Sequence, residues 1–197
     1  MDAEEKKRRL AQIIIEKSFK YREDPPFVLA SGRTSNYYFN CKPTTLNPEG
    51  MNLIGEIVFA MLAGDEITAA GGLTLGADPI ANALSVISFQ KGKPIKSFIV
   101  RKDAKGHGTK SAIEGDVAQG ERVVIIDDVI TTGGSTIMAI EQARQAGLIV
   151  ARVICLVDRE EGGRENIEAR GLAGRVEAIL TRTEIMGYAG KAEGLRA

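Results

Sequence analysis

The stretch 123–136, VVIIDDVITTGGST, constrains the fold of this 197-residue chain more than any other. It begins as an apolar run without alternation, which is typical of a parallel strand covered on both faces. Two aspartates and a turn rich in threonine and glycine follow this run. The next residues, 136–147, have helical periodicity and stop at a glycine. We therefore expect a buried strand, a polar loop and a helix, in that order.

Apolar runs alternate with helical patterns along the rest of the chain. Strands are expected near residues 67–71, 95–101, 122–127, 149–157 and 175–181, and helices at 4–18, after Asn47-Pro48-Glu49, from Pro79, after Ser135 and at 161–171. Parallel strands separated by helices are joined by right-handed crossovers. The sequence thus predicts an α/β fold with a mainly parallel central sheet flanked by helices.

A small flap, or hood, is expected beside this core. The prolines at 25–26 interrupt the chain, and residues 27–29 and 37–39 have the composition of short strands. They lie on either side of the polar turn 31–35. The sequence therefore predicts a two-stranded flap near the N-terminus.

Length and composition favour a single domain, because 44% hydrophobic residues suffice for a buried core in a chain of this size. We expect it to cover 1–197, with a helix and the flap in about 1–45 and the α/β core in about 46–182. The 26 basic side chains balance 26 acidic ones, so there is no net field to hold a polyanion. No nucleic-acid partner is expected.

Signals for soft metals, disulfides and membranes are weak. Cys41 and Cys155 are far apart in sequence and His107 is the one histidine, so neither a disulfide nor a zinc site is expected. Residues 1–10 are charged and lack the apolar core of a secretion signal. No stretch is apolar over the length that spans a bilayer. We expect a cytoplasmic protein that binds no membrane.

The strand end and loop within 123–136 carry the groups that bind a phosphorylated sugar. Ligands bind at the carboxyl ends of strands in open α/β sheets, where Asp127 and Asp128 are expected. Helix-start amides, glycines and hydroxyl side chains form a cradle for a monophosphate. The adjacent carboxylates suit a ribose diol or a hydrated Mg²⁺. The alternative is a strand that merely ends in Asp-Asp before an ordinary turn. The sequence contains no Walker loop, which disfavours a nucleotide triphosphatase.

The stretch 123–136 resembles the signature of the type I phosphoribosyltransferases, which bind 5-phosphoribosyl 1-pyrophosphate (PRPP). The segments 27–42 and 98–109 resemble the orotate phosphoribosyltransferases in particular, and the resemblance spans about 10–182. It implies the type I phosphoribosyltransferase fold and a pentosyl transfer from PRPP to orotate. The products would be orotidine 5-monophosphate and pyrophosphate, in pyrimidine (UMP) biosynthesis, with Mg²⁺ as cofactor and an oxocarbenium-like transition state.

The resemblance also assigns roles to residues. It places Asp127 and Asp128 on the ribose hydroxyls and, through water, on Mg²⁺, and it places 131–136 on the 5-phosphate. The expected catalytic residues are Asp127, Asp128, Lys105 and His107. The expected PRPP-binding residues are Arg101, Lys102, Lys105, His107, Asp127, Asp128, Val129, Ile130, Thr131, Thr132, Gly133, Gly134, Ser135 and Thr136. Whether His107 or a neighbouring lysine donates a proton to the departing pyrophosphate stays open.

The cationic, glycine-rich segment 101–115 is expected to be a moving loop. Long loops without structure of their own are often lids, although a solvated charged loop is the usual alternative. Positive side chains stabilise the departing pyrophosphate, and closure keeps water from competing with the base. The resemblance implies a homodimer in which this loop reaches the neighbouring active site.

The base is expected to meet Arg159, which directly follows a core strand. An arginine offers a stacking face and paired donors to a planar pyrimidine carboxylate. A surface ion pair is the alternative role for this residue. The full set expected to bind orotate is Arg159, Thr131, Ser31, Gly32 and Arg33.

Two positions depart from the family pattern. Some members have lysine where this chain has Ala30 and Leu75. The roles of those lysines in the family therefore cannot be assigned to this chain. We hypothesise that Lys42 restores one of the charges. The loop 71–79, which contains Leu75, is expected to handle pyrophosphate. A phosphoribosyltransferase for another base and a nucleotide-sensing regulator without catalysis are the alternatives, which Arg159 and the cationic loop respectively disfavour.

Overall fold

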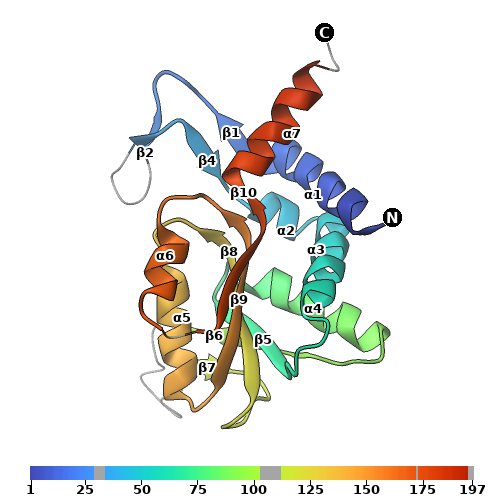
Figure 1. Cartoon of the computed structure of the whole chain (residues 1–197), viewed down its shortest axis with the longest axis vertical. Coiled ribbons are helices and arrows are strands. Elements are labelled where there is room, and N and C mark those ends of the chain that lie inside the picture. The colour runs from blue at the N-terminus through green and yellow to red at the C-terminus, as the bar shows by residue number, and fades with distance from the viewer. Residues whose placement is uncertain (29–33, 103–111, 172, 195–197) are drawn as a thin grey trace.

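A computed structural model describes residues 1–28, 34–102, 112–171 and 173–194 of the chain. Its centre is a six-stranded sheet in the order β10-β9-β8-β5-β6-β7 (Figure 1). The strands are β5 (Ala69–Leu73), β6 (Lys96–Val100), β7 (Ile113–Glu114), β8 (Arg122–Ile130), β9 (Ile149–Asp158) and β10 (Arg175–Thr181). Every neighbouring pair is parallel except β6 and β7. The expected mainly parallel sheet is confirmed.

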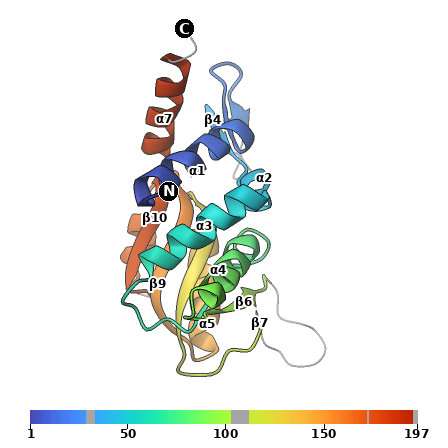
Figure 2. The same cartoon turned by 90° about the vertical axis from the view of Figure 1, so that its right-hand side faces the viewer.

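Helices cover both faces of this sheet (Figures 1 and 2). One face carries α1 (Ala3–Lys17), α3 (Pro48–Met61) and α4 (Asp78–Gln90), and the other carries α5 (Gly134–Gln145) and α6 (Gly163–Glu168). Asn47 caps α3 as expected, because its side chain accepts from two first-turn amides. The fold is therefore the three-layer arrangement that alternating strands and helices predict.

Strand β8 shows why its apolar run does not alternate. Val124 and Ile126 pack into the cluster beneath α1, α3 and α4, whereas Val123 and Ile125 pack into the cluster beneath α5. All four side chains are at most 1% exposed, and each such burial contributes about 2 kcal/mol. Because side chains alternate along a strand, the faces of the two aspartates that follow must also differ.

The flap contains more strands than expected. β1 (Phe19–Tyr21) pairs antiparallel with β4 (Tyr37–Phe39), and β2 (Phe27–Val28) pairs with β3 (Thr34–Ser35). The expected strands at 27–29 and 37–39 thus have separate partners. The rings of Phe19 and Phe39 lie 5.1 Å apart. A short helix, α2 (Lys42–Thr45), joins the flap to the core.

Several element bounds differ from the expectations. β8 continues to Ile130, because pairing with β9 extends to Ile130 and Asp158. The segment 101–115, expected to be a loop throughout, ends in β7, which pairs with β6. α6 is shorter than 161–171 because Gly162, with a φ of 85°, holds the left-handed position just before it.

A C-terminal helix, α7 (Arg182–Gly194), was not expected. It begins with a capping box, in which the Glu184 amide donates to Thr181 Oγ1 and Glu184 Oε2 accepts from the Thr181 amide. α7 lies against α1 (Figures 1 and 2), where Lys7 pairs with Glu184 at 2.7 Å. The exposed glycine at 187 conceals the helix from a pattern search.

Within the described part of the chain, no helix combines the length and apolar character needed to cross a membrane.

Candidate active site

The site forms where β5 and β8 part at their carboxyl ends. The two strands pair only from Ala69 and Val123 to Gly71 and Ile125. Beyond that point, the last residues of β5 no longer pair with β8 but still lie against it. A Cβ at Gly72 would lie 2.0 Å from the Ile126 carbonyl oxygen, so only glycine permits this approach.

Asp127 is a buried carboxylate facing α5. It is 8% exposed, and Oδ2 accepts a hydrogen bond from Thr136 Oγ1 at 2.5 Å while Oδ1 accepts from the Asp128 amide at 2.9 Å. Burial raises the pKa of Asp127 to about 7, and the neighbouring Asp128 charge adds to this rise. Both oxygens are therefore occupied by the protein itself.

Asp128 is the more accessible of the two aspartates. It is half-buried and lies over the loop after β5, since a Cβ at Gly76 would come within 2.4 Å of Asp128 Oδ1. Beneath it, Cys41 is free and 1% exposed, and burial followed by the charge of Asp128 raises the pKa of its thiol. Asp128 thus presents its carboxylate between the two loops that were expected to bind anions.

The loop from Thr131 to Gly134 leads directly into α5. Gly133 takes a left-handed φ of 82°, and the first intrahelical bond runs from the Ile137 amide to the Gly133 carbonyl. The amides of 134–136 therefore have no acceptor within the helix and point out of its amino end. With the exposed Thr132 and Ser135 beside them, they form an anion cradle.

Helix α6 supports this loop from one side. A Cβ at Gly163 would lie 2.6 Å from the Thr131 carbonyl oxygen, and one at Gly133 would lie 2.8 Å from the Gly163 carbonyl oxygen. Asn166 Nδ2 donates to the Thr132 carbonyl at 3.1 Å. The two glycines thus let a second element hold the loop by direct backbone contact.

Two residues expected to bind PRPP have other side-chain roles. The Thr136 hydroxyl is buried and donates to Asp127, so it does not join the cradle as expected. Ile130 is 1% exposed and its side chain belongs to the core beneath α5. Its carbonyl accepts the Arg159 amide at 3.0 Å, which ties the end of β8 to the loop carrying that arginine. Val129 and Thr131 are half-buried.

Arg159 is 5% exposed, which excludes the alternative of a surface ion pair. Its Nη2 lies 2.7 Å from Glu161 Oε1 and 3.3 Å from Ser35 Oγ of the flap. Its guanidinium is 6.0 Å from the centre of the Phe39 ring. Among the described residues, its Nε has no hydrogen-bond partner. A buried guanidinium with a spare donor is thus positioned between the flap and the strand end.

The cationic loop is anchored at its described ends. The Arg101 amide donates to the Ala112 carbonyl at 2.8 Å, and Arg101 Nη1 lies 3.3 Å from Glu114 Oε1. Lys102 is exposed. The other expected residues of this loop and of the flap turn lie outside the described residues, namely Lys105, His107, Ser31, Gly32 and Arg33, together with Ala30.

Leu75, the second departure from the family pattern, is 70% exposed in the loop after β5. Lys42 is exposed at the start of α2. In the described part of the chain, no hydrogen bond or ion pair joins the Lys42 side chain to this loop, so its compensating role stays a prediction.

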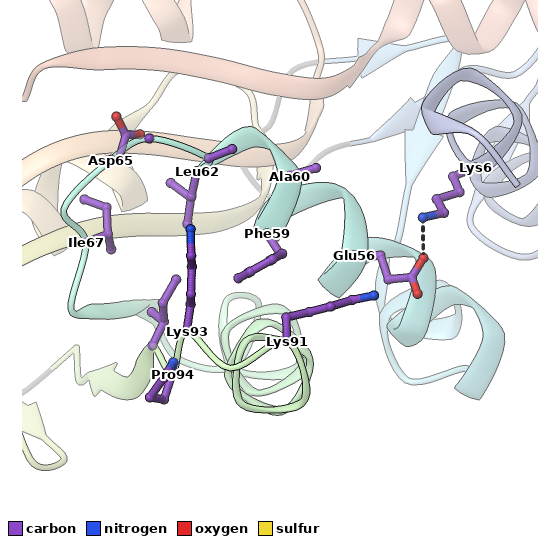
Figure 3. Close-up of a pocket in the computed structure, with 13 residues that line it drawn as sticks. Lys6, Glu56, Phe59, Ala60, Leu62, Asp65, Ile67, Lys91, Lys93 and Pro94 are labelled. Atoms are coloured by element: carbon purple, nitrogen blue, oxygen red, sulfur yellow. Dashed lines mark ion pairs between the residues drawn. The ribbon is translucent and has the colours of Figure 1, made fainter.

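A cavity of about 520 Å³ lies elsewhere on the molecule (Figure 3). Its lining includes Leu62, Ile67 and Pro94, from the segments that enter β5 and β6. It therefore lies at the amino edge of the sheet, opposite the aspartates. Its rim pair, Lys6 and Glu56, is 2.6 Å apart, and the hydrogen bond from Lys6 lowers the pKa of Glu56. Ligand binding in this fold class occurs at the other edge.

From the sequence, Ser35 was expected only as part of the polar turn 31–35 and Gly76 only as part of the loop 71–79, and two residues of this site, Glu161 and Asn166, were missed. The paired glycines before Arg164 were the available signal for the loop support, since adjacent glycines indicate close backbone approach. The contact between Ser35 and Arg159 has no such signal, because it joins residues 124 positions apart.

Comparison with known proteins agrees with this geometry. The phosphoribosyl transferase domain family matches residues 68–170. The orotate phosphoribosyltransferase of Aquifex aeolicus is 48% identical over 164 residues, which cover 83% of this chain and 90% of that protein. The protein of the same name from Bradyrhizobium diazoefficiens is 49% identical, covering 83% and 88% of the two chains.

Solved structures show the same fold. A crystal structure of the Mycobacterium tuberculosis orotate phosphoribosyltransferase superposes with a TM-score of 0.79 at 35% identity, covering 91% of this chain and 98% of that one. Another crystal structure of that protein, in complex with PRPP, gives a TM-score of 0.75 at 33% identity, with coverage of 91% and 98%. The chain belongs to the orotate phosphoribosyltransferase family, within the phosphoribosyl transferase domains.

Proposed function

We propose that this protein transfers the phosphoribosyl group of PRPP to orotate, forming orotidine 5-monophosphate and pyrophosphate for pyrimidine biosynthesis. The observation that supports this best is the junction of three parts at one sheet edge. Asp128, the loop entering α5 and Arg159 lie together there, and the bond from the Arg159 amide to Ile130 links the last of these to β8. Each part matches one portion of the two substrates.

The 5-phosphate is assigned to the loop before α5. The amides of 134–136 and the hydroxyls of Thr131, Thr132 and Ser135 supply donors to a dianion without a lysine. The positive end of the α5 dipole adds to this attraction. Thr136 contributes its amide, while its hydroxyl orients Asp127.

The ribose hydroxyls are assigned to Asp128. A carboxylate accepts two hydrogen bonds from a diol, and a negative charge beside the sugar favours the developing oxocarbenium character. Asp127 acts from beneath by accepting the Asp128 amide, which fixes the backbone at this point. The two aspartates therefore have different roles in this proposal, rather than the equal ones expected from sequence.

The departing pyrophosphate is assigned to the loop 74–77 and to the cations of the 101–115 segment. Arg101 and Lys102 stand at the described end of that segment. Lys105 and His107 remain proposed partners, and the proton donor is one of them. Cations stabilise the leaving group most when it carries its full charge, so they act on the transition state more than on bound PRPP.

Orotate is assigned to Arg159 and the flap. A planar guanidinium pairs with a carboxylate in two parallel bonds, and burial strengthens such pairs. Among the described residues Arg159 Nε has no hydrogen-bond partner, and we assign this donor to the substrate carboxylate. A base without a carboxylate would leave this buried cation with one partner fewer, which disfavours neutral bases.

The donor set fits Mg²⁺ only together with substrate oxygens. The described residues contain no group of three or more histidine, cysteine or acidic side chains able to hold a metal. Mg²⁺ is usually held by one or two carboxylates, water and substrate phosphates, so Asp128 would supply the protein ligand. Asp127 fits less well because both its oxygens accept protein hydrogen bonds. The ion would neutralise charge on the pyrophosphate.

We further propose that residues 1–197 act as one domain and that two copies form a homodimer. Packing of α1 against α3 and α7 supports the single domain. The dimer, with the 101–115 segment reaching the neighbouring site, follows from the family resemblance. Light scattering coupled to size-exclusion chromatography measures the mass in solution, and a monomer under assay conditions would contradict the shared site.

The activity is tested by incubating the protein with PRPP and Mg²⁺ and one of five bases, followed by chromatography of the nucleotides. The bases are orotate, uracil, adenine, guanine and hypoxanthine. Orotidine 5-monophosphate should form at a rate well above every other nucleotide. Formation of another nucleotide alone would refute the assignment of the base site, and binding of PRPP without any product would favour the regulator.

A further inference from the structure

The short loop after β9 contains a strained residue that the assigned chemistry does not use. Glu160 has a φ of 55°, and it is the one non-glycine residue with positive φ in the described part of the chain. A left-handed conformation is unfavourable for a residue that carries a side chain. Such a conformation persists only where neighbouring contacts enforce it.

The Glu160 side chain has those contacts, and all of them lie in α7. Glu160 Oε2 accepts from the Thr183 amide at 2.9 Å and from the Thr183 hydroxyl at 2.6 Å. Arg182 Nε lies 3.6 Å from the same oxygen. A carboxylate from another segment therefore caps the first turn of α7, where free amides and the helix dipole favour a negative charge.

The Glu160 backbone lies directly between the two members of the base-site ion pair. Arg159 precedes it and Glu161 follows it, and their side chains are 2.7 Å apart. Asp158 Oδ1 accepts the Glu160 amide at 2.8 Å, which closes a tight turn around Arg159. Since a left-handed residue reverses the chain locally, its conformation sets the relative directions of the side chains on either side.

The same strand of the flap contacts both segments. The Arg182 guanidinium is 5.6 Å from the centre of the Tyr37 ring, and that of Arg159 is 6.0 Å from the Phe39 ring. Tyr37 and Phe39 are two residues apart in β4 and so project from the same face. The start of α7, the loop with Arg159 and the flap thus meet around Glu160.

We propose that Glu160 is a positioning residue, which directs Arg159 toward orotate by anchoring its loop to the first turn of α7. The C-terminal helix is then part of the support of the base site. This inference rests on the assignment of Arg159 to orotate. It predicts that loss of the anchor weakens orotate binding while PRPP binding, which depends on β8 and α5, is kept.

The test compares Glu160→Ala, Glu160→Gln and Glu160→Gly by steady-state kinetics. Glu160→Ala should raise the KM for orotate on the order of tenfold, which corresponds to about 1.4 kcal/mol. The KM for PRPP should stay within about twofold, because the substitution leaves the hydrogen bonds of β8 and of the loop before α5 unchanged. Glu160→Gln keeps an acceptor for Thr183 and should recover most of the orotate affinity.

Glu160→Gly separates the anchor from the backbone strain. Glycine adopts the left-handed conformation without cost but cannot reach Thr183. If the anchor positions Arg159, this variant should resemble Glu160→Ala. An orotate KM equal to that of the unmodified protein would overturn the proposal, because the turn alone would then suffice.

Two controls keep the outcome interpretable. Asp2→Ala removes the side-chain cap of α1, far from the base site, and should lower stability with no change in the orotate KM. Arg159→Lys tests the underlying assignment. If Arg159→Lys leaves the orotate KM unchanged, the assignment of the base site fails. If only Arg159→Lys raises it and Glu160→Ala does not, the role of Glu160 alone is refuted.

Discussion

The Thr136 hydroxyl donates to Asp127 Oδ2 at 2.5 Å, joining α5 to β8 across the loop that binds the 5-phosphate in our proposal. Both groups are buried, at 1% and 8% exposure. The bond therefore closes the loop at its base in a medium of low dielectric, where hydrogen bonds to charged groups are strong. The shape of the anion cradle depends on this contact.

Replacing Thr136 by valine should destabilise the protein and loosen the cradle. It leaves a buried carboxylate oxygen without its donor, which costs about 1–3 kcal/mol. Urea denaturation measures the free energy of unfolding, and the KM for PRPP should rise at the same time. Thr136→Ser keeps the hydroxyl and is the matched control. An unfolding free energy in Thr136→Val equal to that of the unmodified protein would show that the bond to Asp127 does not stabilise the fold.

The buried Asp127 should make stability pH-dependent in a defined window. Its pKa is raised from 3.8 to about 7, mainly by burial, so the folded protein holds a proton that the unfolded chain has lost between these values. Stability from this group is full below the lower value and is lost as the pH rises toward 7.

Asp127→Asn tests this window because asparagine has similar shape and no charge. In buffer without metal ions or substrates, urea denaturation between pH 5 and pH 8 should show a smaller fall in the unfolding free energy for the variant than for the unmodified protein. Parallel pH profiles would show that Asp127 does not titrate there. We also expect turnover to fall, because the amide at Asp128 loses its charged acceptor.

Gly76 should be intolerant of a side chain because it lies against Asp128. A methyl group there would come within 2.4 Å of Asp128 Oδ1 and must displace the carboxylate or the loop. Gly76→Ala should lower kcat/KM for PRPP by at least tenfold, which corresponds to about 1.4 kcal/mol. Gly187 in α7 has nothing within 4 Å of its own Cβ position. Gly187→Ala should keep full activity and gain up to about 1 kcal/mol of stability.

Arg152 should matter for folding and not for catalysis. This 8% exposed residue of β9 pairs with Asp65 and Glu177 and donates to the Met61 carbonyl at the amino edge of the sheet. Its partners stay partly solvated, at 36% exposure for Asp65 and 21% for Glu177, so Arg152→Ala should cost less than the loss of a fully buried pair, about 1–3 kcal/mol of unfolding free energy. Both KM values should be kept at a temperature where the variant is folded, and a selective rise in either would contradict this role.

The sequence predicted the sheet well because its signals are local and strong. The apolar run at 123–126 and the Asn47 cap each depend on residues adjacent in sequence, and both are found as expected. α7 was missed because its glycines obscure the helical pattern. The Thr-x-x-Glu capping box at Thr181 was the signal for this helix.

The site was predicted in outline but not in its details. The loop between Asp127 and Thr136 was recognisable from composition, yet the different burial of the two aspartates was not. The two aspartates differ in burial because side chains alternate along a strand and different helices cover the two faces of the sheet. Only the assembled fold decides which helix covers which face. The contacts of Arg159 with Ser35 and of Asn166 with Thr132 join distant segments, so no local pattern encodes them.

The initial rate of orotate consumption shows whether this sheet edge transfers phosphoribose to orotate. Ultraviolet absorbance follows this rate with PRPP and Mg²⁺ for the unmodified protein and for Asp128→Asn. Consumption should require both PRPP and Mg²⁺, and it should fall by about a hundredfold in Asp128→Asn, because a charge that stabilises the transition state is removed. An unchanged rate in Asp128→Asn would contradict the proposed role of this sheet edge.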